Sequence, residues 1–366
     1  MSTRRIIQVS AYYLPHVGGQ EWAVKDLATN LAANGNDVTV LTSDQGGEAG
    51  THEENGVKVV RLKSVEFAHT AIMGGLFFEL LKCAGKDDVV HVHIGQAFTP
   101  EIVWLASKFK RFKYVAQMHI EPTASGPVGS LLAVYKRIFL KRALRAASAV
   151  IVLNKEHKQI IEKKYGYRGK ISVMNNGMNE EYFQLKRKPK HGKVINLFTV
   201  ARFSPQKNLP MLVEALKWTR HKVHLDIIGD GEERPKIEEA IRENHLEEQV
   251  TLHGQLDRSE NVAFYASCDA FVLASLYEAQ PLVLLEAMAS RAPIIGTNVQ
   301  GIGEHIKGVG YLVEPTAASI AAGIDAFAED PTHGEHFAEA AFKKAQAFRW
   351  STLLKKYEAI YNEVSK

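Results

Sequence analysis

Cysteine is scarce in this sequence of 366 residues, in which only Cys83 and Cys268 are present. They lie far apart and match no metal-ligand spacing, so we expect no metal site and a reducing, cytoplasmic compartment. No stretch approaches the roughly 18 apolar residues of a membrane span. The first residues, MSTRRIIQVSAYY, also lack the apolar core of a signal peptide. We therefore expect a protein that does not span a membrane.

Two motifs that would point to other functions are also missing. No G-x-G-x-x-G follows the first predicted strand, which argues against a dinucleotide-dependent oxidoreductase. No recognised nucleic-acid-binding motif is present, so we expect no nucleic-acid partner. The composition, 46% hydrophobic and 23% charged, is ordinary for a soluble globular protein. At this length one hydrophobic core is rarely sufficient, which predicts two domains.

The net charge of +4 is unevenly distributed. Residues 1–180 hold 23 Lys and Arg against 16 Asp and Glu, whereas the remainder holds 22 against 25. The basic segment 105–145 contributes most of this difference, and Glu121 is its single acid. A basic amphipathic helix at 131–148 can lie on an anionic membrane surface, although the same pattern fits a helix that packs its apolar face inward. Peripheral contact with a membrane is therefore one expectation for this segment.

Short apolar strands alternate with amphipathic helices along the chain, which predicts parallel sheets covered by helices on both faces. We expect strands at 5–10, 37–42, 57–62, 87–94, 114–118, 149–153, 194–201, 224–228, 249–256 and 268–275, and helices at 21–34, 71–83 and 131–148 and from Lys155, Leu209 and Pro281 onward. The polar stretch 185–193 reads as a linker, which gives domains at 1–185 and 193–348.

Two carboxylates, Glu278 and Glu286, stand in the segment ASLYEAQPLVLLEAMA. Pro281 suits the first turn of a helix, so Glu278 is expected in the preceding loop and Glu286 on the second turn. A helical path between them would rise about 12 Å, whereas a glycosidase pair flanks one bond at roughly 5 to 9.5 Å. This separation favours an elongated ligand such as a nucleotide sugar. A solvated loop residue and a helix-face residue would show the same spacing.

Three further places are candidates for ligand binding. Gly18 and Gly19 precede a predicted helix, where free N–H groups favour an anion, although a plain turn has the same sequence. His119 follows a strand, and ligands of open parallel sheets collect at the carboxyl ends of strands. Arg202 and Lys207 follow the first strand of the second domain and suit a diphosphate, unless both are simply exposed.

The segment EAQPLVLLEAMA resembles the E-x7-E motif of the retaining glycosyltransferases of family 4, which have the two-domain GT-B fold. The resemblance extends over nearly the whole chain: YYLPHVGGQEWAV is similar to the family's glycine loop, ARFSPQKN to its basic loop, and FRWSTLLKKYEAIYNEV to its closing helix, so that residues 349–366 would return to the first domain. Departures from the pattern occur at Asn179, Ala201, Asn208, Arg291 and Gln300.

This resemblance implies a retaining transfer of a hexosyl unit from a nucleotide sugar to a glycan, a lipid-linked or a small-molecule acceptor, without a catalytic metal or cofactor. A UDP-sugar is favoured, and GDP-mannose stays open. Glu278 would grip the donor sugar and Glu286 the ribose, and His119 would contact the sugar while Arg202 and Lys207 stabilise the diphosphate. The remaining donor contacts would come from Gly18, Gly19, Gly254, Gln255, Ala279, Gln280, Pro281, Leu282 and Val283.

Two other functions remain open from the sequence. A protein of this fold could epimerise or hydrolyse a nucleotide sugar, or bind a nucleotide or a membrane without catalysis. The argument against a non-catalytic binder is that the sequence contains all four charged residues expected at the donor site: Arg202, Lys207, Glu278 and Glu286.

Overall fold

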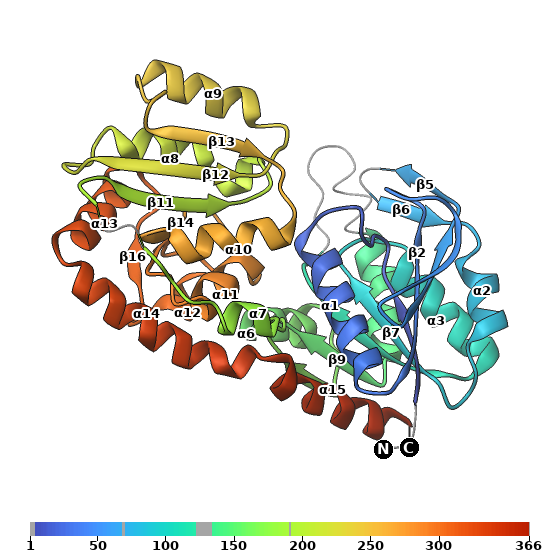
Figure 1. Cartoon of the computed structure of the whole chain (residues 1–366). Coiled ribbons are helices and arrows are strands. Elements are labelled where there is room, and N and C mark those ends of the chain that lie inside the picture. Colours follow the sequence, from blue (N-terminus) through green and yellow to red (C-terminus); the bar gives the residue numbers. More distant parts are fainter. Residues whose placement is uncertain (1–3, 68–69, 122–133, 190–191, 366) are drawn as a thin grey trace. The chain divides into compact units, whose positions relative to one another are not determined.

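The computed structural model describes residues 4–67, 70–121, 134–189 and 192–365 (Figure 1). The chain divides into two compact units, one formed by residues 1–177 and 350–366 and the other by residues 178–349. The predicted return of the C-terminal helix to the first domain is confirmed, because α15 (Trp350–Ser365) belongs to the first unit.

The first unit is built on an eight-stranded sheet with the order β10-β9-β8-β7-β1-β2-β4-β3. All neighbours pair in parallel except β3 and β4, which are antiparallel. The strands are β1 (Arg5–Val9), β2 (Asp37–Ser43), β3 (Gly50–Glu54), β4 (Val57–Leu62), β7 (Val89–Ile94), β8 (Lys113–Met118), β9 (Ala149–Val152) and β10 (Lys170–Val173). Their buried faces carry mostly Val and Ile, as expected for parallel strands covered on both sides.

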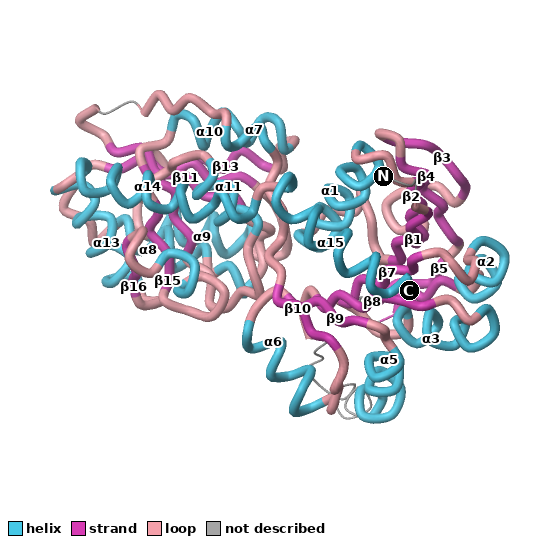
Figure 2. The backbone as a smooth tube through the Cα atoms, turned by 90° about the horizontal axis from the view of Figure 1, so that it is seen from below, coloured by secondary structure: helices cyan, strands magenta, loops and turns pink. Residues whose placement is uncertain are grey.

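Helices cover both faces of this sheet (Figure 2). On one face lie α2 (Leu76–Cys83), α3 (Thr99–Lys110) and α5 (Lys141–Ala146), and on the other lie α1 (Gly19–Ala33) and α15. Helix α15 buries Leu353, Tyr357, Ile360, Tyr361 and Val364, whose spacing of three and four residues places them on one face of the helix. After β9 the chain continues through α6 (Lys155–Gln159) and a π-helical turn, Ile160–Lys164.

Two predicted helices of the first unit differ from the structure. Residues 71–83 do not form one helix: Thr70–Met73 is strand β6, which pairs with β5 (Ser64–Phe67), and Gly74 and Gly75 separate it from α2. Glycine lowers helix propensity, and the antiparallel partner strand satisfies the backbone instead. Residues 131–133 of the predicted basic helix lie outside the described residues, and Lys136–Leu140 is π-helical before α5 begins. Helix α3 falls where we predicted no element.

The second unit holds a six-stranded, fully parallel sheet with the order β13-β12-β11-β14-β15-β16. The strands are β11 (Ile195–Val200), β12 (Val223–Ile228), β13 (Val250–Gly254), β14 (Ala270–Leu273), β15 (Ile294–Thr297) and β16 (Tyr311–Val313). The helices are α7 (Glu180–Phe183), α8 (Leu209–Leu216), α9 (Arg234–Glu243), α10 (Arg258–Ser267), α11 (Leu282–Ala289), α12 (Gly303–Ile306), α13 (Ala317–Glu329) and α14 (Pro331–Ala345). This strand order is that of the doubly wound nucleotide-binding sheet.

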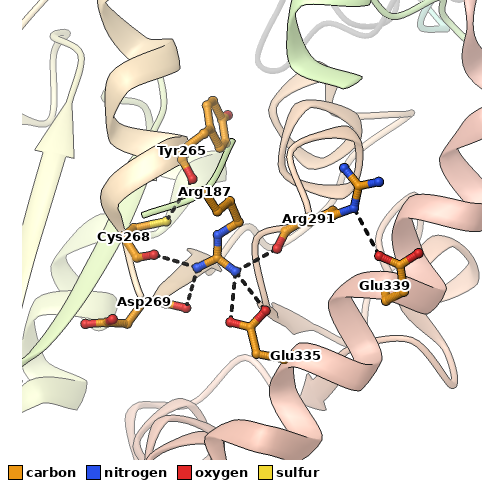
Figure 3. Close-up of polar contacts among 7 residues, drawn as sticks. All are labelled: Arg187, Tyr265, Cys268, Asp269, Arg291, Glu335 and Glu339. Atoms are coloured by element: carbon orange, nitrogen blue, oxygen red, sulfur yellow. Dashed lines mark hydrogen bonds and ion pairs between the residues drawn. The ribbon is translucent and has the colours of Figure 1, made fainter. Parts of the chain in front are cut away.

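The predicted linker 185–193 belongs to the second unit, and the chain divides before it, after Gly177. Arg187 explains the difference, because its buried guanidinium donates to the carbonyl oxygens of Cys268 at 2.7 Å and Arg291 at 2.7 Å and pairs with Glu335 at 3.0 Å (Figure 3). Burial of Cys268 among these groups raises the pKa of its thiol to about 12. A polar and basic composition suggested a linker, but one arginine attaches this segment to the second unit.

Replacing Arg187 with methionine is expected to lower the free energy of unfolding by about 2 to 4 kcal/mol, because buried acceptors and one carboxylate lose their donor. Urea denaturation of the full chain measures this change. The control is Glu339→Gln, which removes the more exposed Arg291–Glu339 pair at 3.0 Å and should cost less than about 1 kcal/mol. Equal effects of the two substitutions would contradict the attachment role of Arg187.

Candidate functional site

The second sheet changes winding direction between β11 and β14, and in such sheets ligands bind outside the carboxyl ends of the strands at this point. The loop after β11 carries Arg202 and Lys207, and the loop after β14 carries Glu278. Segments some seventy positions apart in sequence are therefore neighbours because β11 and β14 pair directly, Leu197 with Ala270 and Phe198 with Phe271.

Lys207 and Glu278 form the centre of this candidate site. The Lys207 ammonium lies 2.5 Å from Oε1 of Glu278, and both side chains are largely shielded from solvent. The hydroxyl of Ser275 donates to the same oxygen at 2.8 Å, and the amide of Gln206 donates to Oε2 at 3.3 Å. The carboxylate is thus fixed by three donors, so its position is set before any ligand arrives.

The backbone around Glu278 is fixed as well. Its N–H donates to the carbonyl of Gln300 at 3.1 Å, and Thr297 donates from its hydroxyl to the carbonyl of Ser275 at 2.6 Å. Gly301 has φ +76°, and a Cβ atom built on it would lie 2.2 Å from the carbonyl oxygen of Glu278. Only glycine permits both this conformation and this close approach.

Arg202 is exposed and forms no hydrogen bond or ion pair through its side chain with the residues that the structure describes. Its loop packs tightly against the loop after β12, since a Cβ at Gly229 would lie 1.9 Å from the carbonyl oxygen of Ala201. Asp230 in that loop pairs with Arg234 at 2.9 Å. Arg202 is therefore a cation available to a ligand.

Glu286 has different partners from Glu278. It is buried on α11, where Arg258 of α10 lies 3.0 Å from its Oε1 atom and the hydroxyl of Tyr265 donates to Oε2 at 3.0 Å. Arg258 also donates to the hydroxyl of Tyr182 at 3.2 Å. Burial and the nearby Glu286 carboxylate raise the pKa of Tyr265 well above its usual value, so its hydroxyl stays protonated as a donor.

The chain between the two acids leads into α11. Pro281 is not in the first helical turn as predicted but directly before the helix, because its ψ of 122° is extended and the helix begins at Leu282. Gln280, Pro281 and Leu282 are buried, whereas Ala279 and Val283 are partly exposed. The first N–H groups of α11 have no partner within the helix and favour an anion together with the helix dipole.

Two of the predicted donor-contacting residues, Gly254 and Gln255, lie at and just after the end of β13. Gly254 has φ +74° and accepts a hydrogen bond at its carbonyl from the N–H of Gly229 at 2.8 Å. Gln255 follows and is exposed. Both therefore lie at the carboxyl end of the sheet, as Lys207 and Glu278 do.

In the first unit, a carboxylate that the sequence interpretation overlooked lies beside the glycine loop, in the first turn of α1. Gly18 precedes α1, which begins at Gly19, and a Cβ on Gly18 would lie 2.3 Å from Oε2 of Glu21. Glu21 is buried and lies 3.2 Å from Nδ1 of His16, whose ring stacks on Tyr12. A phosphate at this loop would meet the Glu21 carboxylate, so the position suits hydroxyl groups better.

His119 follows β8 and is buried. Its Nε2 atom lies 3.0 Å from Nδ1 of His93 on β7, and Nε2 of His93 lies 3.1 Å from the amide oxygen of Gln8 on β1. His91, on the same strand face as His93, lies 2.8 Å from the hydroxyl of Tyr361. The histidines at 91 and 93 therefore pack inside the unit, and His93 orients His119.

Burial keeps these imidazoles neutral. It lowers the pKa of His119 and of His91 from 6.5 to about 3, and it lowers the pKa of His93 well below its usual value. In the unfolded chain the same groups bind protons below about pH 6.5. Acid therefore favours the unfolded state in this unit.

Acidification from pH 7 to pH 5 is expected to destabilise the protein by about 1 kcal/mol per histidine for each pH unit below 6.5, because the unfolded state binds more protons. The effect should continue down to about pH 3, the folded pKa of His91 and His119. Urea denaturation at several pH values measures it, and His91→Gln should make the dependence shallower. A stability that is constant between pH 7 and pH 5 would contradict these neutral histidines.

The structure also identifies residues that sequence reasoning missed. Ser275 and Gln206 hold Glu278, and Arg258 and Tyr265 hold Glu286. Gly301, which shapes the Glu278 loop, directly follows Gln300, one of the positions that depart from the family pattern. The others are ordinary polar residues whose partners lie on different elements.

Among the described residues, no three His, Cys, Asp or Glu side chains are gathered in a way that could hold a metal ion. Within the same part of the chain, no helix combines the length and the apolar character needed to cross a membrane.

Two family models match most of the chain between them. The model described as Glycosyltransferase Family 4 matches residues 17–182, and the model described as Glycosyl transferases group 1 matches residues 180–344. Together with the two parallel sheets, these matches define the chain as a glycosyltransferase with the GT-B fold.

Particular relatives cover three quarters of the chain or more. The chain is 27% identical to a glycogen synthase of Mycobacterium tuberculosis over 98% of this chain and 94% of the relative. It is 29% identical to the N-acetyl-alpha-D-glucosaminyl L-malate synthase of Bacillus anthracis, over 76% of this chain and 75% of the relative.

Solved structures show the same fold. A sucrose-phosphate synthase from Thermosynechococcus elongatus aligns with a TM-score of 0.81 at 22% identity, over 99% of both chains. The Anabaena protein HepE in complex with UDP and glucose aligns with a TM-score of 0.75 at 20% identity, over 97% of this chain and 98% of that chain.

Proposed function

We propose that this glycosyltransferase moves a hexosyl unit from a nucleotide sugar, with a UDP-sugar as the favoured donor, to a hydroxyl group of a glycan, a lipid-linked or a small-molecule acceptor. We further propose that it belongs to the retaining enzymes of family 4 and needs no metal or other cofactor. The observation that carries the proposal is the Lys207–Glu278 pair at the winding switch of a nucleotide-binding sheet.

The donor assignment is supported by the ligands of similar proteins. HepE was solved with UDP and glucose, and its fold is that of this chain. A glycogen synthase and an N-acetyl-alpha-D-glucosaminyl L-malate synthase stand among the relatives, and both names denote enzymes that make a sugar-containing product. Their named products differ, so these relatives support the reaction type without selecting an acceptor.

Catalysis in this proposal is mostly electrostatic. The bond between the anomeric carbon and the diphosphate oxygen breaks, and Arg202, Lys207 and the first N–H groups of α11 stabilise the negative charge that grows on the leaving group. These groups supply the positive charge that a metal ion supplies in other enzymes. Glu278 accepts hydrogen bonds from hydroxyls of the sugar ring, on which positive charge develops.

Retention follows if the acceptor oxygen bonds to the anomeric carbon on the face that the diphosphate leaves. The acceptor's proton then passes to an oxygen of the departing diphosphate, so that no protein base is required. Glu286, already held by Arg258 and Tyr265, is proposed to turn its carboxylate to the ribose hydroxyls of the donor, and Gly254 and Gln255 to border its base.

The first unit is proposed to supply the acceptor side. The Glu21 carboxylate beside Gly18 and Gly19 accepts hydrogen bonds, which suits acceptor hydroxyls better than phosphate. His119, neutral and oriented by His93, is proposed to contact the donor sugar.

The proposal is tested first by thermal-shift screening against UDP- and GDP-sugars, in which a UDP-sugar should raise the melting temperature most. Incubation of the stabilising donor with candidate acceptors, followed by NMR of the product's anomeric proton, then tests retention, and EDTA should leave the rate unchanged. If free sugar or an epimer forms in the absence of an acceptor, the reaction is hydrolysis or epimerisation and not sugar transfer. If no nucleotide sugar raises the melting temperature, the proposed donor site is wrong.

A further inference from the structure

Two exposed phenylalanines of the first unit lie against the same ring, that of Phe77. Phe78 of α2 is 71% exposed and Phe109 of α3 is 66% exposed. The ring of Phe77 touches both at its edges, with centroids 5.5 Å from Phe78 and 5.6 Å from Phe109. Figure 1 shows α2 and α3 side by side, and both pack on the same sheet face.

The solvent-exposed face of helix α3 carries both apolar and basic side chains. Its buried positions include Val103 and Ala106, whereas Leu105, Lys108 and Phe109 are exposed at a spacing of three and four residues. We call Phe78, Leu105, Lys108 and Phe109 the α2–α3 patch. A soluble protein seldom exposes large apolar side chains in a group, and such groups mark interaction surfaces.

The charge around the α2–α3 patch is positive. Lys108, Lys110 and Arg111 at the end of α3 are exposed and form no ion pair with any residue in the described part of the chain. Glu79, the acid of α2, pairs with Lys82 at 3.5 Å. Uncompensated cations therefore border the aromatic side chains.

Helix α5 extends the positive surface. It packs beside α3 on the same face of the sheet and adds Arg142 and Arg145, both exposed. Glu121, the single acid between residues 105 and 145, lies 3.2 Å from Lys136 and 2.5 Å from Lys164. Its charge is neutralised locally, so it does not offset the arginines.

We propose that the α2–α3 patch docks on an anionic lipid bilayer. Phenylalanine and leucine side chains enter the boundary between head groups and acyl chains, while lysine and arginine side chains reach the phosphates, and this combination binds a membrane surface without crossing it. A protein partner with the same charge complementarity would need acidic groups interleaved with apolar pockets, whereas a bilayer offers a continuous anionic layer above an apolar one. This docking surface is independent of the proposed sugar transfer.

The test is co-sedimentation of the full chain with phosphatidylcholine vesicles that either contain or lack phosphatidylglycerol. Binding is expected only with phosphatidylglycerol and should weaken as salt is raised, because salt screens the attraction. The double substitution Phe78→Ser/Phe109→Ser should weaken binding about tenfold or more. Lys108→Glu/Lys110→Glu should weaken it by a similar factor, about tenfold or more.

Matched controls separate this surface from general hydrophobicity and charge. Val65→Ser/Phe67→Ser removes apolar side chains that are 73% and 59% exposed on the β5–β6 ribbon, and Lys355→Glu/Lys356→Glu reverses exposed charges on α15, on the other face of the sheet. Both control proteins should bind vesicles like the unchanged protein. Equal loss in the controls, or equal binding to pure phosphatidylcholine, would overturn the proposal.

Two further measurements keep the outcome clear. Sedimentation velocity without lipid tests whether the α2–α3 patch instead joins two copies of the chain, in which case the phenylalanine variant would be monomeric and vesicle binding absent. Thermal-shift response to the nucleotide-sugar donor should be the same in all four variants, because none of these residues lies in the second unit. A failure of vesicle binding with an intact donor response would reject the membrane surface and leave the sugar-transfer proposal standing.

Discussion

Replacement of Lys207 with methionine is expected to lower turnover with the nucleotide-sugar donor about 100- to 1000-fold, the loss that follows removal of one preorganised group facing developing charge. Lys207 is the cation of the site that the structure already holds in place, 2.5 Å from Glu278. As the diphosphate leaves, its charge rises, and a neutral side chain of similar length would not stabilise it. Steady-state and single-turnover rates of sugar transfer measure the effect.

The kinetic pattern distinguishes the possible roles of Lys207. If its charge acts mainly on the transition state, kcat should fall and donor affinity should fall less, and Lys207→Arg should recover part of the rate. Lys217→Met, at an exposed position just after α8, serves as the matched control and should be neutral. Unchanged turnover in Lys207→Met would remove the lysine from the mechanism altogether.

Replacement of Gly301 with alanine is expected to lower both stability and activity. At φ +76° an alanine is strained, and its Cβ would lie 2.2 Å from the carbonyl oxygen of Glu278 and 3.0 Å from that of Ala279. The Glu278 loop must therefore move, which would displace the carboxylate from Lys207. We expect a loss of about 2 to 4 kcal/mol in unfolding free energy, the strain of the residue plus a steric conflict in packed surroundings.

Gly308 provides a control for Gly301 within the same unit. It has nearly the same φ, +75°, but a Cβ there would meet no atom within 4 Å. Gly308→Ala should therefore cost only about 1 to 2 kcal/mol and leave sugar transfer intact. Thermal unfolding and transfer rates of both variants compare the two glycines, and equal losses of activity would show that the contact with the Glu278 loop is unimportant.

The elements that carry the candidate site were largely predictable. Strong local patterns marked β2, β4, β8 and β11, whereas α15 was predicted from the family resemblance; the two parallel sheets and the returning helix agree with the prediction. The errors lie where local signals conflict with tertiary context. Thr70–Met73 became a strand because β5 pairs with it, and residues 185–189 joined the second unit because Arg187 reaches three of its segments.

The approach of Lys207 to Glu278 was predictable to a degree, because both follow strands of a doubly wound sheet. The partners of Glu286 and His119 were not. Arg258 and Tyr265 stand on α10, and His93 stands on a neighbouring strand, so these contacts join residues that no sequence spacing relates.

The sequence by itself determined the fold class and the identity of the charged groups, since strand and helix periods and the residues at strand ends are local properties of a chain. Only the tertiary structure decided which acid meets which cation, which histidines are buried and neutral, and that Phe78 and Phe109 share one exposed surface. The physical reason is that burial and pairing depend on segments brought together from distant positions, and along the chain such segments carry no common signal.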